Sequence, residues 1–294
     1  MFDERNPEQV CTRFDEAAET LRANPHRRGS HVRLPGRGRI LITGDLHDNP
    51  EHFRKIVHAA NLDRDPDHHV VLHELIHGEH LVNGMDFSYR MLIKVADLVV
   101  KYPAQVHPLL ANHELSQMTG KGVSKGAGNS VELFNDALEW TFGDACGEVV
   151  EAINAFFHAM PLALRSESGL FCAHSLPNER AMKSFDPDIL ERELTDEDYR
   201  SPAGSAYLMT WGRSYREAQV NELARRWGVS LFCLGHQHVE TGIDLRLPNV
   251  LVLNSDHDRA MVLSLALDNL PEPEEAMMSA TPLAAINLPE PNAS

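Results

Sequence analysis

The stretch RILITGDLHD, residues 39–48, decides the fold that we expect for this chain. Its apolar and β-branched run, residues 40–43, predicts a buried strand. The strand ends at Asp45 and His47, which are two residues apart, so an extended backbone would place both side chains on the same side. An apolar strand that ends in a carboxylate and an imidazole predicts a polar site at the carboxyl edge of a sheet.

Strand-like and helical patterns alternate on both sides of this stretch. PEHFRKIVHAANL (50–62) and SYRMLIKVADLVVKYP (88–103) have helical periodicity, and HHVVLHEL (68–75) and QVHPLLANHE (105–114) read as strands, which gives a βαβαβ beginning. Further strand-like runs follow in PLALRS, SGLFCAHS, SLFCLGHQH, LPNVLVLNS and AMVLSLAL. We therefore expect an α/β fold of two mixed β-sheets packed face to face and flanked by helices.

The chain divides into three parts by composition. We expect residues 1–37 to form a peripheral helical segment and a connector. Residues 38–268 are expected to form the main domain, with a helical insertion at 116–160. Residues 269–294 carry prolines and acids without periodicity, and they predict a disordered tail.

The charge balance argues against several classes of partner. The 294 residues include 43 Asp and Glu against 27 Lys and Arg, a net charge of -16, which repels nucleic acid and anionic membrane surfaces. No apolar run approaches the 18 residues that a membrane-spanning helix needs. The four cysteines are widely spaced and form no CxxC pair, so we expect a cytoplasmic protein without disulfides.

Five strand-like runs end in residue types that bind metals. The later ones end in VVLHE, LLANHE, LFCAHS and LFCLGHQH, which supply Glu74, then Asn112 and His113, then His174, then His236 and His238. Because the carboxyl ends of parallel strands meet at one edge of a sheet, these side chains are expected to converge.

This ordered series, from GDLHD through NHE to GHQH, resembles the calcineurin-like metallophosphoesterases over residues 38–268. KYPAQVHPLLANHE and GHQHVETGIDL are most similar to the phosphoprotein (serine/threonine) phosphatase branch. The resemblance implies a four-layer sandwich and hydrolysis of phosphomonoesters by attack of a hydroxide that bridges two metal ions. The implied substrate is a phosphorylated protein, a nucleotide or another small phosphate ester.

The resemblance also implies roles for individual residues. The first metal would be bound by Asp45, His47 and His238, the second by Asn112, His174 and His236, and Glu74 would bridge them. His113 would donate a proton to the leaving group or orient the phosphate. Mixed imidazole, carboxylate and amide ligands suit Mn, Fe or Zn.

The second motif departs from the family pattern. Where the family has GDxxD, this chain has HELIH, so Glu74 replaces the bridging aspartate. His77 replaces the aspartate that supports the catalytic histidine, and an imidazole cannot hold His113 protonated as a carboxylate would. His77 is therefore a candidate catalytic residue, with contact to substrate or metal as alternatives.

Two further residues are candidates for substrate binding. Arg213 lies 23 residues before His236, where the protein phosphatases have an arginine that contacts phosphate, and a guanidinium can bind two phosphoryl oxygens. His257 follows the strand after GHQH, where the family places a loop over the site. For Arg213, a solvated surface arginine is the alternative interpretation.

Two other functions compete with the phosphatase. His73, Glu74 and His77 spell HExxH, which on a helix would be the zinc site of a metalloprotease. The β-branched run before His73 instead favours a strand, and a helix over residues 70–77 would decide for the protease. The altered second motif also allows a catalytically silent binding module with the same fold.

Overall fold

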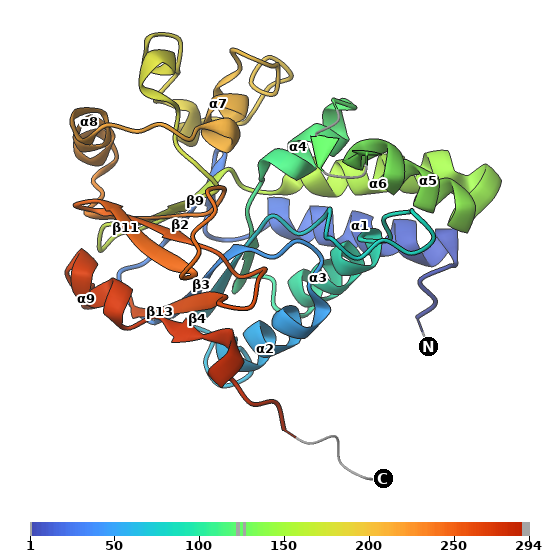
Figure 1. Ribbon diagram of the computed structural model, residues 1–294, viewed down its shortest axis with the longest axis horizontal. Helices are drawn as coiled ribbons and strands as arrows, with labels where there is room; N and C mark the ends of the chain where they lie inside the picture. Colours follow the sequence, from blue (N-terminus) through green and yellow to red (C-terminus); the bar gives the residue numbers. More distant parts are fainter. Residues whose placement is uncertain (1, 122–123, 126–127, 290–294) are drawn as a thin grey trace.

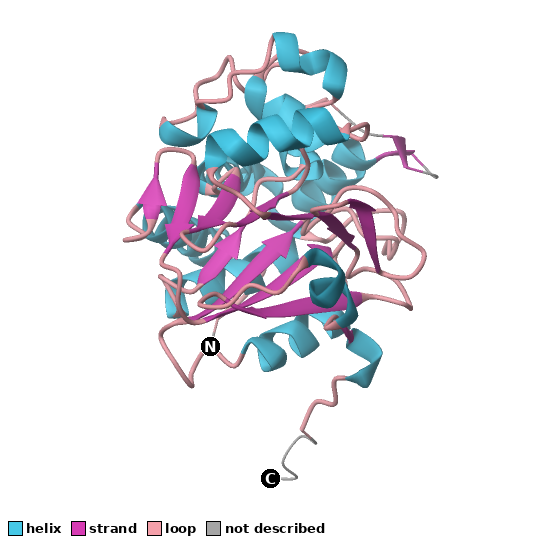
Figure 2. Cartoon of the chain, turned by 90° about the vertical axis from the view of Figure 1, so that its left-hand side faces the viewer, coloured by secondary structure: helices cyan, strands magenta, loops and turns pink. Residues whose placement is uncertain are grey.

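The computed structural model describes residues 2–121, 124–125 and 128–289. Two mixed β-sheets pack face to face, and helices cover their outer faces (Figures 1 and 2). The expected architecture is therefore confirmed.

The first sheet contains the strand from which the fold was inferred. Its order is β14 (Thr281–Pro282), β13 (Met261–Ala266), β3 (Arg39–Asp45), β4 (His68–His73) and β5 (Val106–Pro108). Strands β3, β4 and β5 are parallel, and β13 runs antiparallel to β3. The carboxyl ends of β3, β4 and β5 therefore lie at the same edge.

The second sheet places three more parallel strands opposite the first. Its order is β1 (Arg27–Arg28), β2 (His31–Leu34), β8 (Ala163–Ser166), β9 (Leu170–Ala173), β10 (Leu231–Leu234), β12 (Val250–Leu253) and β11 (Ile243–Leu247). Strands β9, β10 and β12 are mutually parallel.

The helices lie around the two sheets, and some of them pack mainly on other helices. They are α1 (Pro7–Arg22), α2 (Pro50–Ala60), α3 (Tyr89–Lys101), α4 (Asn112–Thr119), α5 (Ser130–Phe142), α6 (Cys146–Ala159), α7 (Ser205–Trp211), α8 (Glu217–Trp227) and α9 (Pro273–Met278). Four short 3-10 turns, η1 (Gly143–Ala145), η2 (Glu179–Lys183), η3 (Ile189–Glu191) and η4 (Leu283–Ala285), and the hairpin β6 (Ser124–Lys125) with β7 (Gly128–Asn129) complete the elements. Helices α4, α5 and α6 occupy most of the predicted helical insertion.

Strand alternation produces two separate hydrophobic cores. Ile42, Val71 and Cys172 point between the sheets, whereas Val70 and Leu72 point toward the helices. Because β4 is buried on both faces, it reads as a continuous apolar run rather than an alternating one. The core between the sheets extends to the edge at which the carboxyl ends of β3, β4 and β5 lie.

The N-terminal segment belongs to the main fold and is not peripheral. Helix α1 buries Val10, Phe14 and Leu21 against α3 and α6, and β2 pairs in parallel with β8. The polar surface of α1 dominates its composition, so the sequence hides how firmly its apolar stripe is packed.

The C-terminal segment also differs from the prediction. Residues 269–289 form α9, β14 and η4; α9 contacts strands of both sheets, β14 pairs with β13, and Ala276 and Leu283 are buried. The prediction of disorder from the proline-rich composition is therefore wrong for these residues, because a few apolar contacts and one strand pairing hold them in place. Residues 290–294 lie outside the described range.

Candidate metal centre

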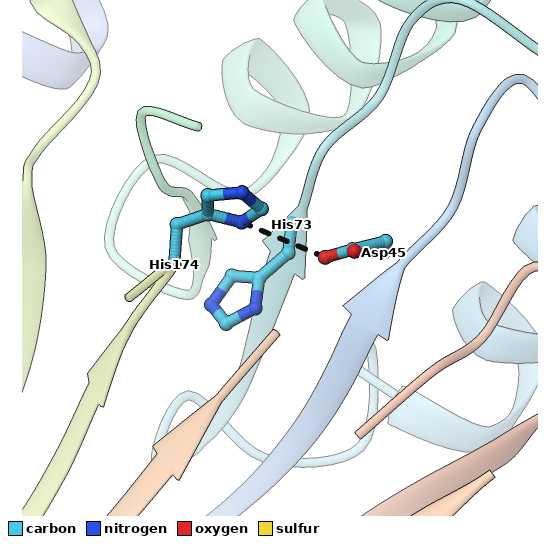
Figure 3. A group of neighbouring side chains, drawn as sticks. All are labelled: Asp45, His73 and His174. Carbon is cyan, nitrogen blue, oxygen red and sulfur yellow. Dashed lines mark ion pairs between the residues drawn. The ribbon is translucent and has the colours of Figure 1, made fainter. Parts of the chain in front are cut away.

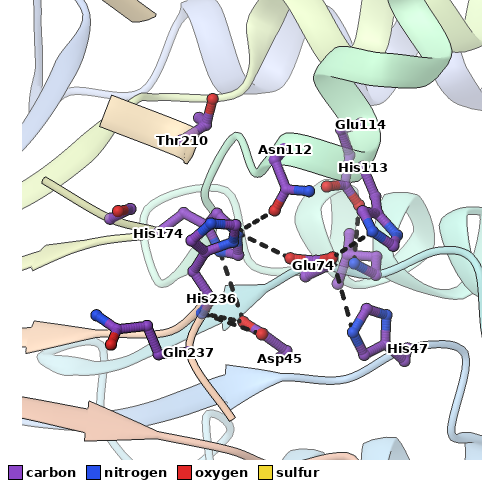
Figure 4. Close-up of polar contacts among 12 residues, drawn as sticks. Asp45, His47, Glu74, Asn112, His113, Glu114, His174, Thr210, His236 and Gln237 are labelled. Carbon is purple, nitrogen blue, oxygen red and sulfur yellow. Dashed lines mark hydrogen bonds and ion pairs between the residues drawn. The ribbon is translucent and has the colours of Figure 1, made fainter. Parts of the chain in front are cut away.

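The ends of four strands and the first turn of α4 meet at one edge of the sandwich (Figure 4). β3 supplies Asp45, and β4 is followed directly by Glu74. Helix α4 begins with Asn112 and His113. The opposite sheet supplies His174 after β9 and His236 after β10.

A shift in strand register turns Asp45 toward the opposite sheet. Ile42 pairs with Val71, but Asp45 pairs with His73, so β3 contains one extra residue between these positions. Such a bulge redirects the side chains that follow it. The Asp45 carboxylate accepts hydrogen bonds from the backbone N–H of His236 at 3.0 Å.

Several loops of the site hold non-glycine residues in the left-handed region. His47, Glu74, His77 and His236 have φ between 41° and 68°. Such conformations cost on the order of 1–3 kcal/mol each and are common at functional sites. The prediction that Asp45 and His47 share one extended backbone is therefore wrong, because β3 ends at Asp45 and His47 lies in a turn.

The carboxylate of Glu74 lies between two groups of histidines. Its Oε1 is 3.2 Å from His113 Nε2 and 3.7 Å from His47 Nε2. Its Oε2 is 2.8 Å from His174 Nε2. The two oxygens of the Glu74 carboxylate therefore face different histidines.

The histidines on the opposite sheet form a compact group with an amide oxygen. His174 Nε2 lies 2.6 Å from Asn112 Oδ1 and 3.1 Å from His236 Nδ1. Burial is the main cause that lowers the pKa of His174 to about 3 and that of His236 to about 2. Neutral imidazoles offer lone pairs to a cation.

The donor set fits metal binding. Three groups have ligand atoms within 4.8 Å of one another: Asp45, His73 and His174; His47, Glu74 and His113; and Glu74, His174 and His236. Buried imidazole nitrogens such as His236 Nε2 have no hydrogen-bond partner within the described chain. A bound ion would satisfy groups that are costly to leave unpaired.

Comparison with known proteins agrees with this geometry. A family model described as calcineurin-like phosphoesterase matches residues 38–240. The chain belongs to the calcineurin-like phosphoesterase family. No curated protein gave a match.

Solved structures of phosphatases share the fold of this chain. A serine/threonine phosphatase from Saccharomyces cerevisiae, similar to human phosphatase PP5, has 14% identity and a TM-score of 0.64, with 88% of this chain and 82% of that chain covered. A cold-active protein-tyrosine phosphatase from a psychrophilic Shewanella has 13% identity and a TM-score of 0.59, with 86% and 80% covered.

The HExxH residues of this chain do not form a protease zinc site. β4 ends at His73, and residues 74–77 are a loop in which Glu74 and His77 have positive φ. The two histidines therefore do not share a helix face, and the metalloprotease alternative is wrong.

Besides His77 and Asn112, the predicted residues His238, His257 and Arg213 lie outside these ligand groups. His238 is exposed; its ring centroid is 5.3 Å from that of His257, and both line a cavity of about 620 Å³ with His47. His257 Nε2 lies 3.0 Å from the carbonyl oxygen of Val239. Arg213 is exposed but donates from Nη1 to the carbonyl oxygen of His236 at 2.7 Å, which anchors it beside the centre.

A buried carboxylate that the sequence did not reveal supports His77. Asp86 Oδ2 lies 2.7 Å from His77 Nδ1, and Asp86 Oδ1 accepts from the backbone N–H of Ser88 at 2.9 Å. The ring centroids of His77 and His113 are 5.2 Å apart. The only sequence signal was an acid between the apolar residues Met85 and Phe87.

Glu114, next to His113, positions the loop after β4. Its Oε1 accepts from the backbone N–H of Leu75 at 2.8 Å. Burial, followed by repulsion from the nearby Glu74, raises the pKa of Glu114 to about 8. This contact holds the Glu74 loop against the first turn of α4.

Proposed function

We propose that this chain is a dinuclear, metal-dependent phosphatase that hydrolyses phosphomonoesters. The observation that carries the proposal is the position of Glu74, whose two carboxylate oxygens face separate groups of histidines. Membership of the phosphoesterase family and the phosphatase structures of the same fold support it.

The ligand assignment follows the family motifs and the observed groups. The proposed first-metal ligands are Asp45, His47 and His238, the second-metal ligands are Asn112, His174 and His236, and Glu74 serves both. His238 enters this set from its motif alone, since it lies outside the ligand groups. Mn, Fe or Zn suits such mixed donors. When bound, two ions would acidify water and clamp phosphoryl oxygens.

The remaining residues would handle the proton and the substrate. His113 is proposed to donate a proton to the leaving oxygen, since its Nε2 faces Glu74 at the centre. His77 lies behind it, and Asp86 fixes the His77 ring. Arg213, anchored beside His236, and His257 are proposed to contact the phosphate.

A second cavity beside the centre is a candidate position for the leaving group. It has a volume of about 880 Å³ and is lined by Tyr207, Trp211, Tyr215 and Arg216 among others. The Trp211 ring centroid is 6.2 Å from that of His236. Aromatic walls favour an apolar or aromatic group attached to the phosphate.

The partner is therefore proposed to be a phosphorylated protein or small molecule. A serine/threonine-type protein phosphatase is one form of this proposal, and a nucleotide phosphatase is another. The net charge of -16 weighs against nucleic acid and anionic membranes as partners. No helix of the described chain is long and apolar enough to cross a bilayer. The cytoplasmic location stays a prediction.

The test combines metal analysis with a substrate panel. Purified protein is loaded with Mn, Fe or Zn and assayed on aryl phosphates, aryl phosphodiesters, phosphopeptides and nucleotides. We expect two ions per chain and monoester hydrolysis that Glu74→Gln abolishes, while Glu139→Gln, at an exposed position on α5, retains it. Two bound ions without hydrolysis of any substrate would instead identify a silent binding module.

A further inference from the structure

His73 occupies an unexpected place for a histidine. It is the last residue of β4 and stands where the family motif has a glycine. Its side chain is fully buried, two residues after Val71, which faces the core between the sheets. Neither of its ring nitrogens has a hydrogen-bond partner within the described chain. A residue that served only to fill this space would be apolar, like Val71.

The His73 ring lies beside two residues of the metal centre (Figure 3). Asp45, His73 and His174 each offer one ligand atom, and these three atoms lie within 4.8 Å of one another. The ring centroids of His73 and His174 are 6.1 Å apart, with the rings perpendicular. The three side chains come from β3, β4 and the end of β9, so both sheets contribute.

A glycine in the opposite sheet makes room for this arrangement. A Cβ atom on Gly235 would lie 2.3 Å from Asp45 Oδ1 and 3.1 Å from His73 Nδ1. Any larger residue would displace the carboxylate or press on the ring. The His73 nitrogen and the Asp45 oxygen therefore face the same small volume next to the backbone of Gly235.

Leaving these nitrogens unpaired would be unfavourable. A buried polar group without a partner costs about 1–3 kcal/mol, and both nitrogens of His73 are in this position. A cation held by Asp45, the proposed ligand of the first metal, would satisfy one of them.

We propose that His73 is a further metal ligand of this chain, which joins Asp45 at the first metal from the side of the inter-sheet core, next to His174. This rests on the proposed function, because Asp45 and His174 are metal ligands only under that proposal. An added imidazole replaces an oxygen or water ligand, and nitrogen donors favour borderline cations such as Zn²⁺ and Co²⁺ over Mg²⁺ and Ca²⁺. His73 thus makes the centre selective for the borderline cations.

The test compares metal binding by the wild-type protein with that of two variants. His73→Gly restores the family residue, and His73→Phe fills the space without a nitrogen. We expect the Zn²⁺ affinity of both variants, measured by competition with a chelating indicator, to be at least 10-fold lower than that of the wild-type protein. The Mg²⁺ affinity should decrease less. The visible absorption bands of the Co²⁺-loaded protein should shift in both. His58→Gln, on the exposed face of α2, is the matched control and should change neither quantity.

A measurement on the wild-type protein covers the case in which the variants do not fold. In long-range ¹H–¹⁵N spectra, addition of Zn²⁺ should move one ring nitrogen of His73 into the metal-bound range. Folded variants with wild-type Zn²⁺ affinity and Co²⁺ spectrum, or a His73 ring that Zn²⁺ leaves unshifted, would overturn the proposal. If the wild-type protein binds metal and hydrolyses phosphoesters in that case, only the role of His73 fails; if it binds no metal, the proposed function fails as well.

Discussion

Asp86→Asn is the substitution that tests most directly how the centre compensates for its altered second motif. The side chain of Asp86 is buried, and its Oδ2 accepts from His77 Nδ1 at 2.7 Å. This bond fixes the His77 tautomer, with the proton on Nδ1 and a lone pair on Nε2. Asparagine keeps the shape, but its NH₂ group can donate to Nδ1 and so favour the opposite tautomer.

The magnitude follows from the type of bond that is lost. A hydrogen bond to a charged, buried group contributes about 1.5–3 kcal/mol. If that energy serves to position His77 against the His113 ring, at 5.2 Å, its loss lowers kcat by about 10- to 100-fold, since 1.36 kcal/mol corresponds to one factor of ten. Asp86 acts here as a positioning residue through His77.

The assay separates this role from general damage to the fold. Proton donation matters most when the leaving group is poor, so phenyl phosphate should lose more rate than p-nitrophenyl phosphate. We expect Asp86→Asn and His113→Asn to increase the ratio of kcat for p-nitrophenyl phosphate to kcat for phenyl phosphate, with small changes in KM. Asp136→Asn, at an exposed site on α5, should leave the ratio unchanged. An equal loss on both substrates would refute the role of Asp86 in proton donation.

Three further predictions concern stability, substrate and metal binding. Burial lowers the pKa of His69 to about 4 and that of its partner His107 well below its ordinary value, so both stay neutral in the folded chain while the unfolded chain binds protons below pH 6.5. The free energy of unfolding therefore has its full value above pH 6.5 and decreases toward pH 4, by about 2 kcal/mol at pH 5 from His69 alone. Urea unfolding in the presence of a chelator should show this decrease, and a His69→Phe variant with an unchanged pH dependence would contradict it. Trp211→Ala should raise KM for aryl phosphates several-fold more than for methyl phosphate, and equal KM changes would exclude Trp211 from leaving-group binding. Gly235→Ala should lose bound metal on elemental analysis because its Cβ would lie 2.3 Å from Asp45 Oδ1, whereas full metal content would show that the loop adjusts.

The sequence predicted which side chains after the strand ends lie close together. Glu74, Asn112, His174 and His236 each come within two residues of an apolar run, and the convergence of parallel strands brings them together as expected. Convergence of this kind depends on strand direction and sheet order, which the motif order already implies. His238 has the same sequence signal, yet its side chain is exposed, because the turn after β10 has left the extended conformation.

Asp86 and His73 could not be predicted in the same way. The role of Asp86 depends on a loop between β4 and α3 that returns to His77, and no periodic pattern reports the path of a loop. His73 was visible only as part of HExxH, because its direction depends on which face of β4 points between the sheets. The extra residue in β3 likewise reverses the side of Asp45 without any signal in the residue types.

The three changes in the second motif form one coupled set. Glu74 is one methylene longer than aspartate, about 1.5 Å. Its left-handed backbone follows the end of β4 at His73, and its carboxylate lies between two histidine groups. That ending leaves His73 on the inter-sheet side, where a glycine would leave a space beside Asp45. It also starts the loop that brings His77 to His113, and His77 then needs a carboxylate of its own, which Asp86 supplies. Because each change depends on the same strand ending, restoring one family residue alone should impair the centre rather than return it to the family pattern.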